Sequence, residues 1–333
     1  MSAASTARQE LRPVIAITLG DPAGVGAEVT LKALADPDIQ QSARFIVLGD
    51  RVAAAPAERS TGIPLDSLPV EFRDCLTLPA DADIAMGTLR AEYGAAAVRY
   101  VHDATLMCLQ GEADAMVTAP LNKEAVTLSG MQFSGHTEYI AELCNAVDSR
   151  MLLAGQRLSV VHVSTHISLR EACNLDTARI IRTIELGHEA MKLLGKPRPR
   201  IAVCGLNPHA GEHGLFGTED QRFILPAIEA CRARGIDCEG PVAPDTIFFR
   251  AANGSHDLIV AMYHDQGHIP MKLLDFEATV NMSLGIPILR TSVDHGTAFD
   301  IAGKNIAGAA NMKAAIRMAV TMARHRLQHA VTA

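Results

Sequence analysis

Three histidines stand where they could build a metal site. His166, His209 and His264 each follow a short apolar run that is typical of a buried strand. Because ligands bind at the carboxyl ends of strands in a parallel sheet, imidazoles placed there can converge although many residues separate them. Three neutral imidazoles suit Zn²⁺ or a similar divalent ion and leave positions open for substrate oxygens. Asp265 is a candidate to orient a ligand or to bind the ion itself. Three unrelated histidines at strand ends are the alternative.

A second set of polar residues has the types that bind an anion. His136 and Thr137 stand at a predicted helix start, where backbone amides and a hydroxyl can hold an anion. An arginine such as Arg290 binds phosphate or carboxylate bidentately. A lysine beside a metal can have its pKa lowered enough to act as an acid or a base. Each such residue alone is more often a solvated surface group. The set consists of His136, Thr137, Lys272, Asn281 and Arg290.

A glycine-rich segment, Gly20-Asp-Pro-Ala-Gly24-Val-Gly26, follows one predicted strand and opens a helix. This is the context of a phosphate or dinucleotide loop, but Val29 stands where the Rossmann fingerprint needs its third glycine, and no Gly-Lys-Ser/Thr is present. The segment is either a turn close to a ligand or a tight turn that needs positive φ. We therefore expect that any nicotinamide cofactor binds in another way than the Rossmann one.

Short buried strands alternate with helices, which predicts an α/β fold with a largely parallel sheet covered on both faces. No flexible linker divides the chain, so two sub-domains that share crossovers are expected. Residues 53–82 are dense in Pro, Ala and Asp and have poor periodicity, so we expect a flexible or variable region without chemistry. Strands are predicted at 13–19, 44–49, 115–119, 158–163, 201–206, 258–262 and 286–289, and helices at 27–35, 88–108, 177–194 and 218–233.

The composition excludes several classes of function. The 333 residues are 48% hydrophobic and carry a net charge of −7, so the chain has no general attraction for nucleic acid or an anionic membrane. Neither a long apolar run nor the pattern of a signal peptide is present, which favours the cytoplasm. The partner is expected to be a small molecule.

Several segments together resemble the 4-hydroxythreonine-4-phosphate dehydrogenase family, which serves pyridoxal phosphate (pyridoxine) biosynthesis. The resemblance covers residues 14–303. It implies that His166, His209 and His264 bind zinc, magnesium or cobalt, with ligands drawn from two subunits of a homodimer. It also implies that His136, Thr137, Lys272, Asn281 and Arg290 contact the substrate, largely through its phosphate. The segments that carry it are 18–26, 118–124, 135–138, 207–212, 263–267 and 290–296.

The resemblance implies two α/β/α domains flanking a cleft, similar to isocitrate and isopropylmalate dehydrogenases, which bind NAD without the Rossmann fingerprint. We expect residues 12–130 with 284–333 to form one domain and 131–283 to form the other, with the metal ligands and the dimer contacts. Asp245 and Gly285 are the candidates for contacts with NAD or NADP.

The implied reaction is a metal- and NAD-dependent oxidation, with decarboxylation, of a phosphorylated 3-hydroxy acid. Lys272 and Asp265 are the candidate catalytic residues. His268-Ile-Pro and the segment 214–217 resemble a branch of the family that acts on 4-phospho-D-threonate and 4-phospho-D-erythronate. A relative that oxidises and decarboxylates the cis-dihydrodiol of terephthalate shares His268-Ile-Pro. A zinc hydrolase and a non-enzymatic sensor of a phosphorylated metabolite are the alternatives from other classes.

Overall fold

The computed structural model describes residues 12–275 and 277–332, and the chain divides into two compact units. Unit 1 combines the described residues up to Ser149 with those from Ile286 onward, and unit 2 is Arg150–Gly285. The predicted α/β class is confirmed. The segment 131–149, which the sequence analysis assigns to the central domain, lies in unit 1. It lies there because its helix α7 (His136–Leu143) packs on α5 (Ala91–Leu109) and buries Ile140 in the core of that unit.

The sheet of unit 1 is parallel throughout, in the order β3-β2-β1-β4-β11. Its central strands are almost wholly apolar, as expected for strands that are covered on both faces. Because successive side chains of a strand point to opposite faces, one half of these residues meets each helical layer. The strands are β1 (Val14–Thr18), β2 (Arg44–Gly49), β3 (Val70–Asp74), β4 (Ala115–Thr118) and β11 (Arg290–Val293).

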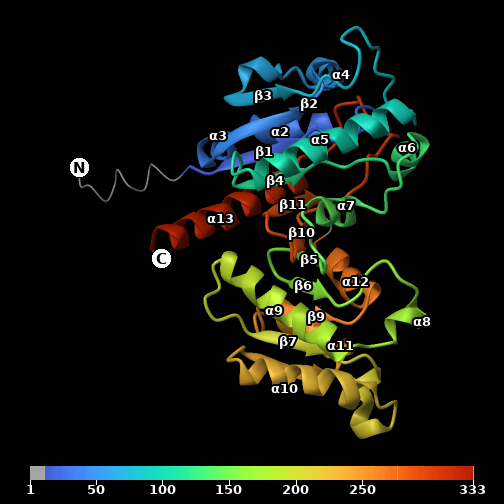
Figure 1. Cartoon of the computed structure of the whole chain (residues 1–333), viewed down its shortest axis with the longest axis vertical. Coiled ribbons are helices and arrows are strands. Elements are labelled where there is room, and N and C mark those ends of the chain that lie inside the picture. Colours follow the sequence, from blue (N-terminus) through green and yellow to red (C-terminus); the bar gives the residue numbers. More distant parts are fainter. Residues whose placement is uncertain (1–11, 276, 333) are drawn as a thin grey trace. The chain divides into compact units, whose positions relative to one another are not determined.

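Helices cover both faces of this sheet (Figure 1). Helix α5 packs on one face, where Ala16, Ile46 and Met116 join its apolar side in one core cluster. The opposite face carries the alternate strand residues, and α2 and α13 cover it. The remaining helices of the unit join these layers. Their bounds are α2 (Gly26–Leu34), α3 (Pro37–Ser42), α4 (Arg51–Thr61), η1 (Leu65–Ser67), α6 (Lys123–Leu128) and α13 (Ala310–Thr332).

The sheet of unit 2 is mixed, in the order β10-β5-β6-β9-β7-β8. β5 runs antiparallel to both β10 and β6, whereas β6, β9, β7 and β8 are parallel to one another. The parallel part therefore has a single carboxyl edge. The strands are β5 (Arg150–Ala154), β6 (Ser159–His162), β7 (Ile201–Cys204), β8 (Cys238–Val242), β9 (Leu258–Ala261) and β10 (Val280–Leu284).

Two helical layers enclose the sheet of unit 2. α9 and α10 pack on one face, and α11 and α12 pack on the other, where Val160, Ile259 and Met271 belong to one core cluster. The bounds are α8 (Leu169–Ala172), α9 (Thr177–Leu193), η2 (Pro208–Gly214), η3 (Asp220–Ile224), α10 (Leu225–Ala233), α11 (Pro244–Ala252) and α12 (His264–Leu274). Among the described residues, no helix combines the length and the apolar character that crossing a membrane requires.

One sequence prediction of local structure is wrong. The apolar run 286–289 is not a strand, because Gly285 turns with φ 78° and the strand β11 begins only at Arg290. Arg290 therefore opens the strand β11 and does not follow a strand at 286–289. The segment 53–82, which is expected to be flexible or variable, contains most of α4 and all of β3. β3 is a short edge strand, Val-Glu-Phe-Arg-Asp, whose apolar and polar residues alternate over only five positions.

Candidate active site

The glycine-rich segment of unit 1 is packed tightly between neighbouring loops. A Cβ on Gly20 would lie 2.3 Å from the carbonyl oxygen of Pro120, and one on Gly26 would lie 2.2 Å from that of Leu19. Gly20 also has φ +72°, a region that favours glycine. These close backbone contacts explain why both positions require glycine. Between them, burial raises the pKa of Asp21 to about 6, and its Oδ2 has no hydrogen-bond partner among the described residues.

Arg290 is a buried cation fixed by a threonine of the adjacent strand. It is 2% exposed, and its guanidinium donates to Oγ1 of Thr118 at 3.2 Å from Nε and 2.6 Å from Nη2. The parallel register pairs Arg290 with Met116, so the arginine side chain reaches two residues along β4 to its carboxyl end. Burial lowers the pKa of Arg290, and the negative charge of Glu138 opposes this effect. A buried cation next to a strand end is suited to bind an anion.

The start of α7 brings a histidine to the same cation. Burial, and then the positive charges of Arg290 and Lys123, hold the pKa of His136 well below its usual value. The ring is therefore neutral at physiological pH. Its Nε2 is buried and has no hydrogen-bond partner among the described residues. A neutral imidazole beside two cations can donate one hydrogen bond to an anion without adding charge.

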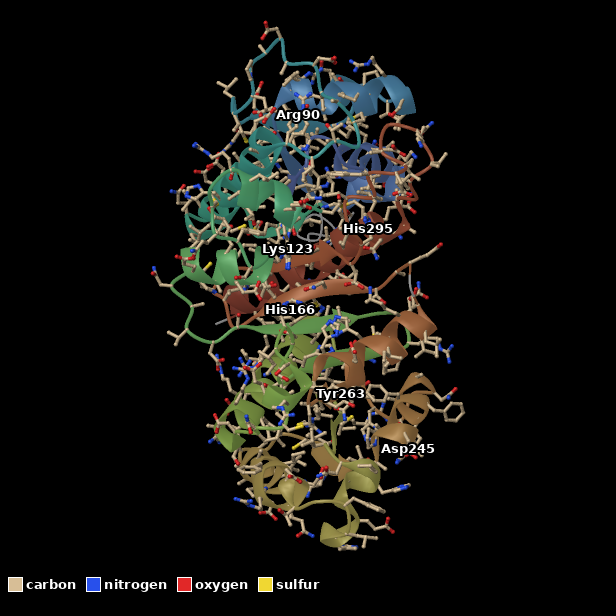
Figure 2. All side chains as sticks on the ribbon, turned by 90° about the vertical axis from the view of Figure 1, so that its right-hand side faces the viewer. Arg90, Lys123, His166, Asp245, Tyr263 and His295 are labelled. Atoms are coloured by element: carbon tan, nitrogen blue, oxygen red, sulfur yellow. The ribbon has the colours of Figure 1, made fainter. Side chains whose placement is uncertain are left out.

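Lys123 is a part of this site that the sequence analysis does not select. It is exposed at the start of α6, on the loop that follows β4 (Figure 2). A Cβ on Gly135 would lie 3.5 Å from Lys123 Nζ and 2.7 Å from Glu138 Oε2, so the lysine reaches the first turn of α7. In the sequence, the segment 118–124 stands out only as a motif of the family that the chain resembles. Its lysine could have been found by following the loop after the strand β4.

Unit 2 places the three predicted metal histidines after three neighbouring parallel strands. His166 follows β6, His264 follows β9 and is the first residue of α12, and His209 follows β7. This is the carboxyl edge of the parallel part, where the sequence pattern placed them. Gln266 fixes the start of α12 there, because it accepts from the Met262 amide at 2.7 Å and donates to the Gly205 carbonyl at 2.8 Å.

His166 and His264 lie side by side, with ring centroids 5.9 Å apart. Two imidazoles that bind one ion at about 2.1 Å place their ring centres roughly 5–6 Å apart, so this separation fits a shared metal. His264 Nδ1 lies 2.6 Å from Asp265 Oδ1. Since a carboxylate only accepts, Nδ1 carries the proton and Nε2 keeps the lone pair that a metal needs.

A pocket of about 290 Å³ adjoins this pair of histidines. Its other walls are largely apolar. They are formed by Thr165, Ile167, Leu169, Ala172, Tyr263 and Asp265.

His209 lies in a loop with unusual backbone geometry. Its φ is 52°, and the residues up to His213 are also in the left-handed region. Buried Asp220 holds this loop by accepting from the backbone amides of Leu206 and Asn207, at 2.8 Å and 3.3 Å, and from the side-chain amide of Asn207. Consecutive left-handed residues cost on the order of 1 kcal/mol or more each and persist only where the surroundings impose them.

Within residues 12–275 and 277–332 of one chain, no three His, Cys, Asp or Glu side chains are grouped closely enough to hold a metal ion. The structure brings His166 and His264 together, with Asp265 orienting His264, but it does not bring His209 to them. The two histidines are a donor pair that fits part of a zinc-type site, and the carboxylate would hold one of them in place.

The other predicted site residues are distributed over both units. Thr137 follows His136 in the first turn of α7, in unit 1. In unit 2, Lys272 lies near the end of α12, and Asn281 lies on β10 with its Oδ1 buried and without a hydrogen-bond partner among the described residues. Asp245 is exposed in the first turn of α11 (Figure 2), and Gly285 turns the chain after β10. Their contacts with substrate or cofactor remain predictions.

Comparison with known proteins defines the class of this chain. The family described as "Pyridoxal phosphate biosynthetic protein PdxA" matches residues 26–319. The chain is 46% identical to D-threonate 4-phosphate dehydrogenase of Cupriavidus necator, over 94% of this chain and 98% of that protein. It is also 46% identical to 4-hydroxythreonine-4-phosphate dehydrogenase of Geobacter metallireducens, over 94% and 96%. The chain belongs to the PdxA family, as its resemblance predicted.

Solved structures agree with this assignment. The 4-hydroxythreonine-4-phosphate dehydrogenase of Klebsiella pneumoniae superimposes with a TM-score of 0.83 at 40% identity, over 94% of this chain and 99% of that one. A terephthalate 1,2-cis-dihydrodiol dehydrogenase of Burkholderia xenovorans gives 0.69 at 32% identity, over 93% and 98%. A β-decarboxylating dehydrogenase of Thermococcus kodakarensis, at 15% identity and 0.52, over 92% and 82%, shares the fold alone. The names of the close relatives support the predicted oxidoreductase class.

Proposed function

We propose that this chain is an NAD(P)- and divalent-metal-dependent dehydrogenase that oxidises a phosphorylated 3-hydroxy acid and releases CO₂ from the product. The observation that carries the proposal is the buried Arg290, fixed by Thr118 and accompanied by Lys123 and the unpartnered Nε2 of His136. Two cations and a neutral donor suit a dianion such as a phosphate monoester. The two relatives at 46% identity are named for phosphorylated hydroxy acids.

The metal would be held by His166 and His264, with His209 as the third ligand in the homodimer that the resemblance implies. The chemistry that a bound divalent ion supplies is polarisation of the substrate hydroxyl and carboxylate oxygens, and that of a bound nicotinamide is acceptance of a hydride. The chain's own residues have other tasks. Asp265 orients His264, and we propose Lys272 for the transfer of the hydroxyl proton.

The anion site is proposed to position the substrate. Arg290, His136, Lys123 and Thr137 would bind the phosphate, with Asn281 as a further polar contact. Binding energy from this remote group can hold the reacting carbon in place, so its loss should affect the turnover of phosphorylated substrates in particular. Asp245 and Gly285 remain the proposed contacts of the nicotinamide cofactor, and the cytoplasm is the proposed location.

A second candidate is the oxidative decarboxylation of an aromatic cis-dihydrodiol carboxylate. The pocket beside His166 favours it, because Ile167, Leu169 and Tyr263 give that pocket apolar walls. A terephthalate cis-dihydrodiol dehydrogenase is 32% identical to this chain. We rank it second because the buried Arg290 and the neutral His136 suit a compact dianion.

A substrate panel tests the proposal. Phosphorylated 4-hydroxy-L-threonine, 4-phospho-D-threonate, 4-phospho-D-erythronate and the cis-dihydrodiol of terephthalate would each be assayed with NAD⁺ and with NADP⁺. We expect reduced-nicotinamide absorbance to grow with at least one phosphorylated acid. Growth with the dihydrodiol alone would favour the second candidate. Metal-dependent release of inorganic phosphate without nicotinamide reduction would show a hydrolase, and tight binding without either activity would show a sensor.

A further inference from the structure

A second histidine of α12 stacks on the proposed metal ligand. His268 lies one helical turn after His264, and the two rings are nearly parallel, with centroids 3.6 Å apart and an interplanar angle of 11°. Residues four apart on a helix face the same side, which allows this contact. His268 Nδ1 also lies 3.1 Å from the carbonyl oxygen of His264, so Nδ1 carries a proton and donates it there. Both interactions tie the ring of His268 to His264.

A third histidine, His162, packs against the ring of His268. His162 is wholly buried on β6, two residues after Val160, and therefore points to the same face, which α12 covers. Its ring centroid lies 4.6 Å from that of His268. A Cβ on Gly267 would lie 2.3 Å from His162 Nε2, so only a glycine lets α12 approach this histidine so closely.

The arrangement is costly in the core of unit 2. His162 donates from Nδ1 to the Met151 carbonyl at 3.3 Å, but its Nε2 is buried without a hydrogen-bond partner among the described residues. Burying a polar atom without a partner costs on the order of 1–3 kcal/mol. His268 is itself only 7% exposed. Apolar side chains would fill the same layer at less cost, so the imidazoles need a reason other than packing.

His268 does not fit the role of a metal ligand. In two parallel stacked rings the nitrogen lone pairs lie in parallel planes and do not meet at one ion. The Nδ1 of His268 is also engaged by a backbone carbonyl. These two facts leave His268 a supporting role toward His264.

We infer that His268 is a positioning residue, which fixes the plane of the His264 ring by stacking while Asp265 fixes its Nδ1. With the ring plane and Nδ1 both fixed, the lone pair of His264 Nε2 points in one direction. The ring then needs no reorientation to bind the metal. This inference rests on the proposed function, since it needs a metal at His264. Residues that support metal ligands in this way typically contribute about 10- to 100-fold in metal affinity.

The test separates stacking from hydrogen bonding. His268→Phe keeps a stacked ring without Nδ1, His268→Gln keeps a polar group without a ring, and His268→Leu has neither. Co²⁺ would be titrated into each metal-free variant, with binding followed by calorimetry and by visible absorption, and kcat and KM would be measured separately. Leu273→Ala is the matched control, because this side chain lies on the same helix and is 86% exposed.

We expect His268→Leu to raise the Co²⁺ Kd about tenfold or more and to alter the visible spectrum, and His268→Phe to recover most of the affinity. If His268→Leu folds poorly, the comparison of His268→Phe with His268→Gln tests the inference. The inference then requires His268→Phe to bind Co²⁺ more tightly than His268→Gln. A Co²⁺ Kd for His268→Leu within twofold of the wild type would overturn the inference. So would a Co²⁺ affinity of His268→Phe that is no higher than that of His268→Gln. Absence of Co²⁺ binding to the wild type would instead overturn the proposed metal site and the inference with it.

Discussion

The guanidinium of Arg290 donates two hydrogen bonds to Oγ1 of Thr118, one strand away in the sheet of unit 1. This contact aligns a buried cation with the end of β4. We predict that Arg290→Ala raises KM about 100-fold for a phosphorylated substrate, because removing a buried partner of an anion costs several kcal/mol.

The control for Arg290 is the dephosphorylated substrate together with Arg99→Ala, since Arg99 is exposed and pairs with Asp103 on α5. Steady-state kinetics on both substrates make the measurement. An equal loss on both substrates would mean that Arg290 does not bind the phosphate.

Lys123 should act as the second, more exposed cation of the same site. Because its charge is exposed, we expect Lys123→Met to raise KM about tenfold at low ionic strength and less at high ionic strength. Lys123→Arg should keep most of the affinity. The neighbouring Glu124→Gln is the control for a change of surface charge at this position. A KM for Lys123→Met that does not differ from the wild type at any salt concentration would remove Lys123 from the site.

The sequence predicted most of the fold because strands with two covered faces are apolar runs, as in β1, β2 and β9. It missed β5, although this strand is a buried apolar run, and it missed strands whose burial is not expressed as such a run. β10 alternates apolar and polar residues, β8 contains Gly240 and Pro241, and β11 consists of Arg-Thr-Ser-Val. The polar residues of β11 are buried because neighbouring strands and helix α13 satisfy them, which depends on tertiary contacts.

Strand-end position placed His166, His209 and His264 after neighbouring parallel strands, and the structure has them there. Their role as metal ligands stays a prediction. Lys123 was missed, because a lysine at a helix start has the same local sequence whether it faces solvent or an anion, and only its position after the strand β4 indicates a site. The stack of His268 on His264 was also not predicted, because the orientation of these rings depends on packing against His162.

His209 is predicted to be the third metal ligand. We expect His209→Asn to lose most of the bound metal and turnover, whereas His213→Asn should keep both. His213 is a close control, because it lies in the same loop and also has positive φ, and asparagine tolerates that conformation at both positions. Metal content after dialysis, measured by mass spectrometry, makes the comparison. Equal metal in the two variants would remove His209 from the site.

The buried His162 should make the metal-free protein less stable in acid. Burial, and then the nearby His268, lower its pKa to about 3. Between pH 6.5 and 3 the unfolded chain therefore binds a proton at this position that the folded chain does not, so stability falls as the pH falls. From pH 7.5 to pH 5 this group should remove roughly 2 kcal/mol from the free energy of unfolding.

His162→Leu isolates this contribution, because all other titrating groups are shared. Urea unfolding at both pH values should show that the wild type loses roughly 2 kcal/mol more than the variant. Parallel pH dependence of the two proteins would show that His162 is not held neutral by burial.

The most direct test of the central claim is the initial rate of nicotinamide reduction with 4-phospho-D-threonate, in untreated, chelator-treated and metal-reconstituted enzyme. D-threonate without phosphate serves as the comparison at each step. We predict reduction that is lost with the chelator, restored by Zn²⁺, Mg²⁺ or Co²⁺, and far slower without the phosphate. Equal rates with and without metal, or with and without the phosphate, would contradict it.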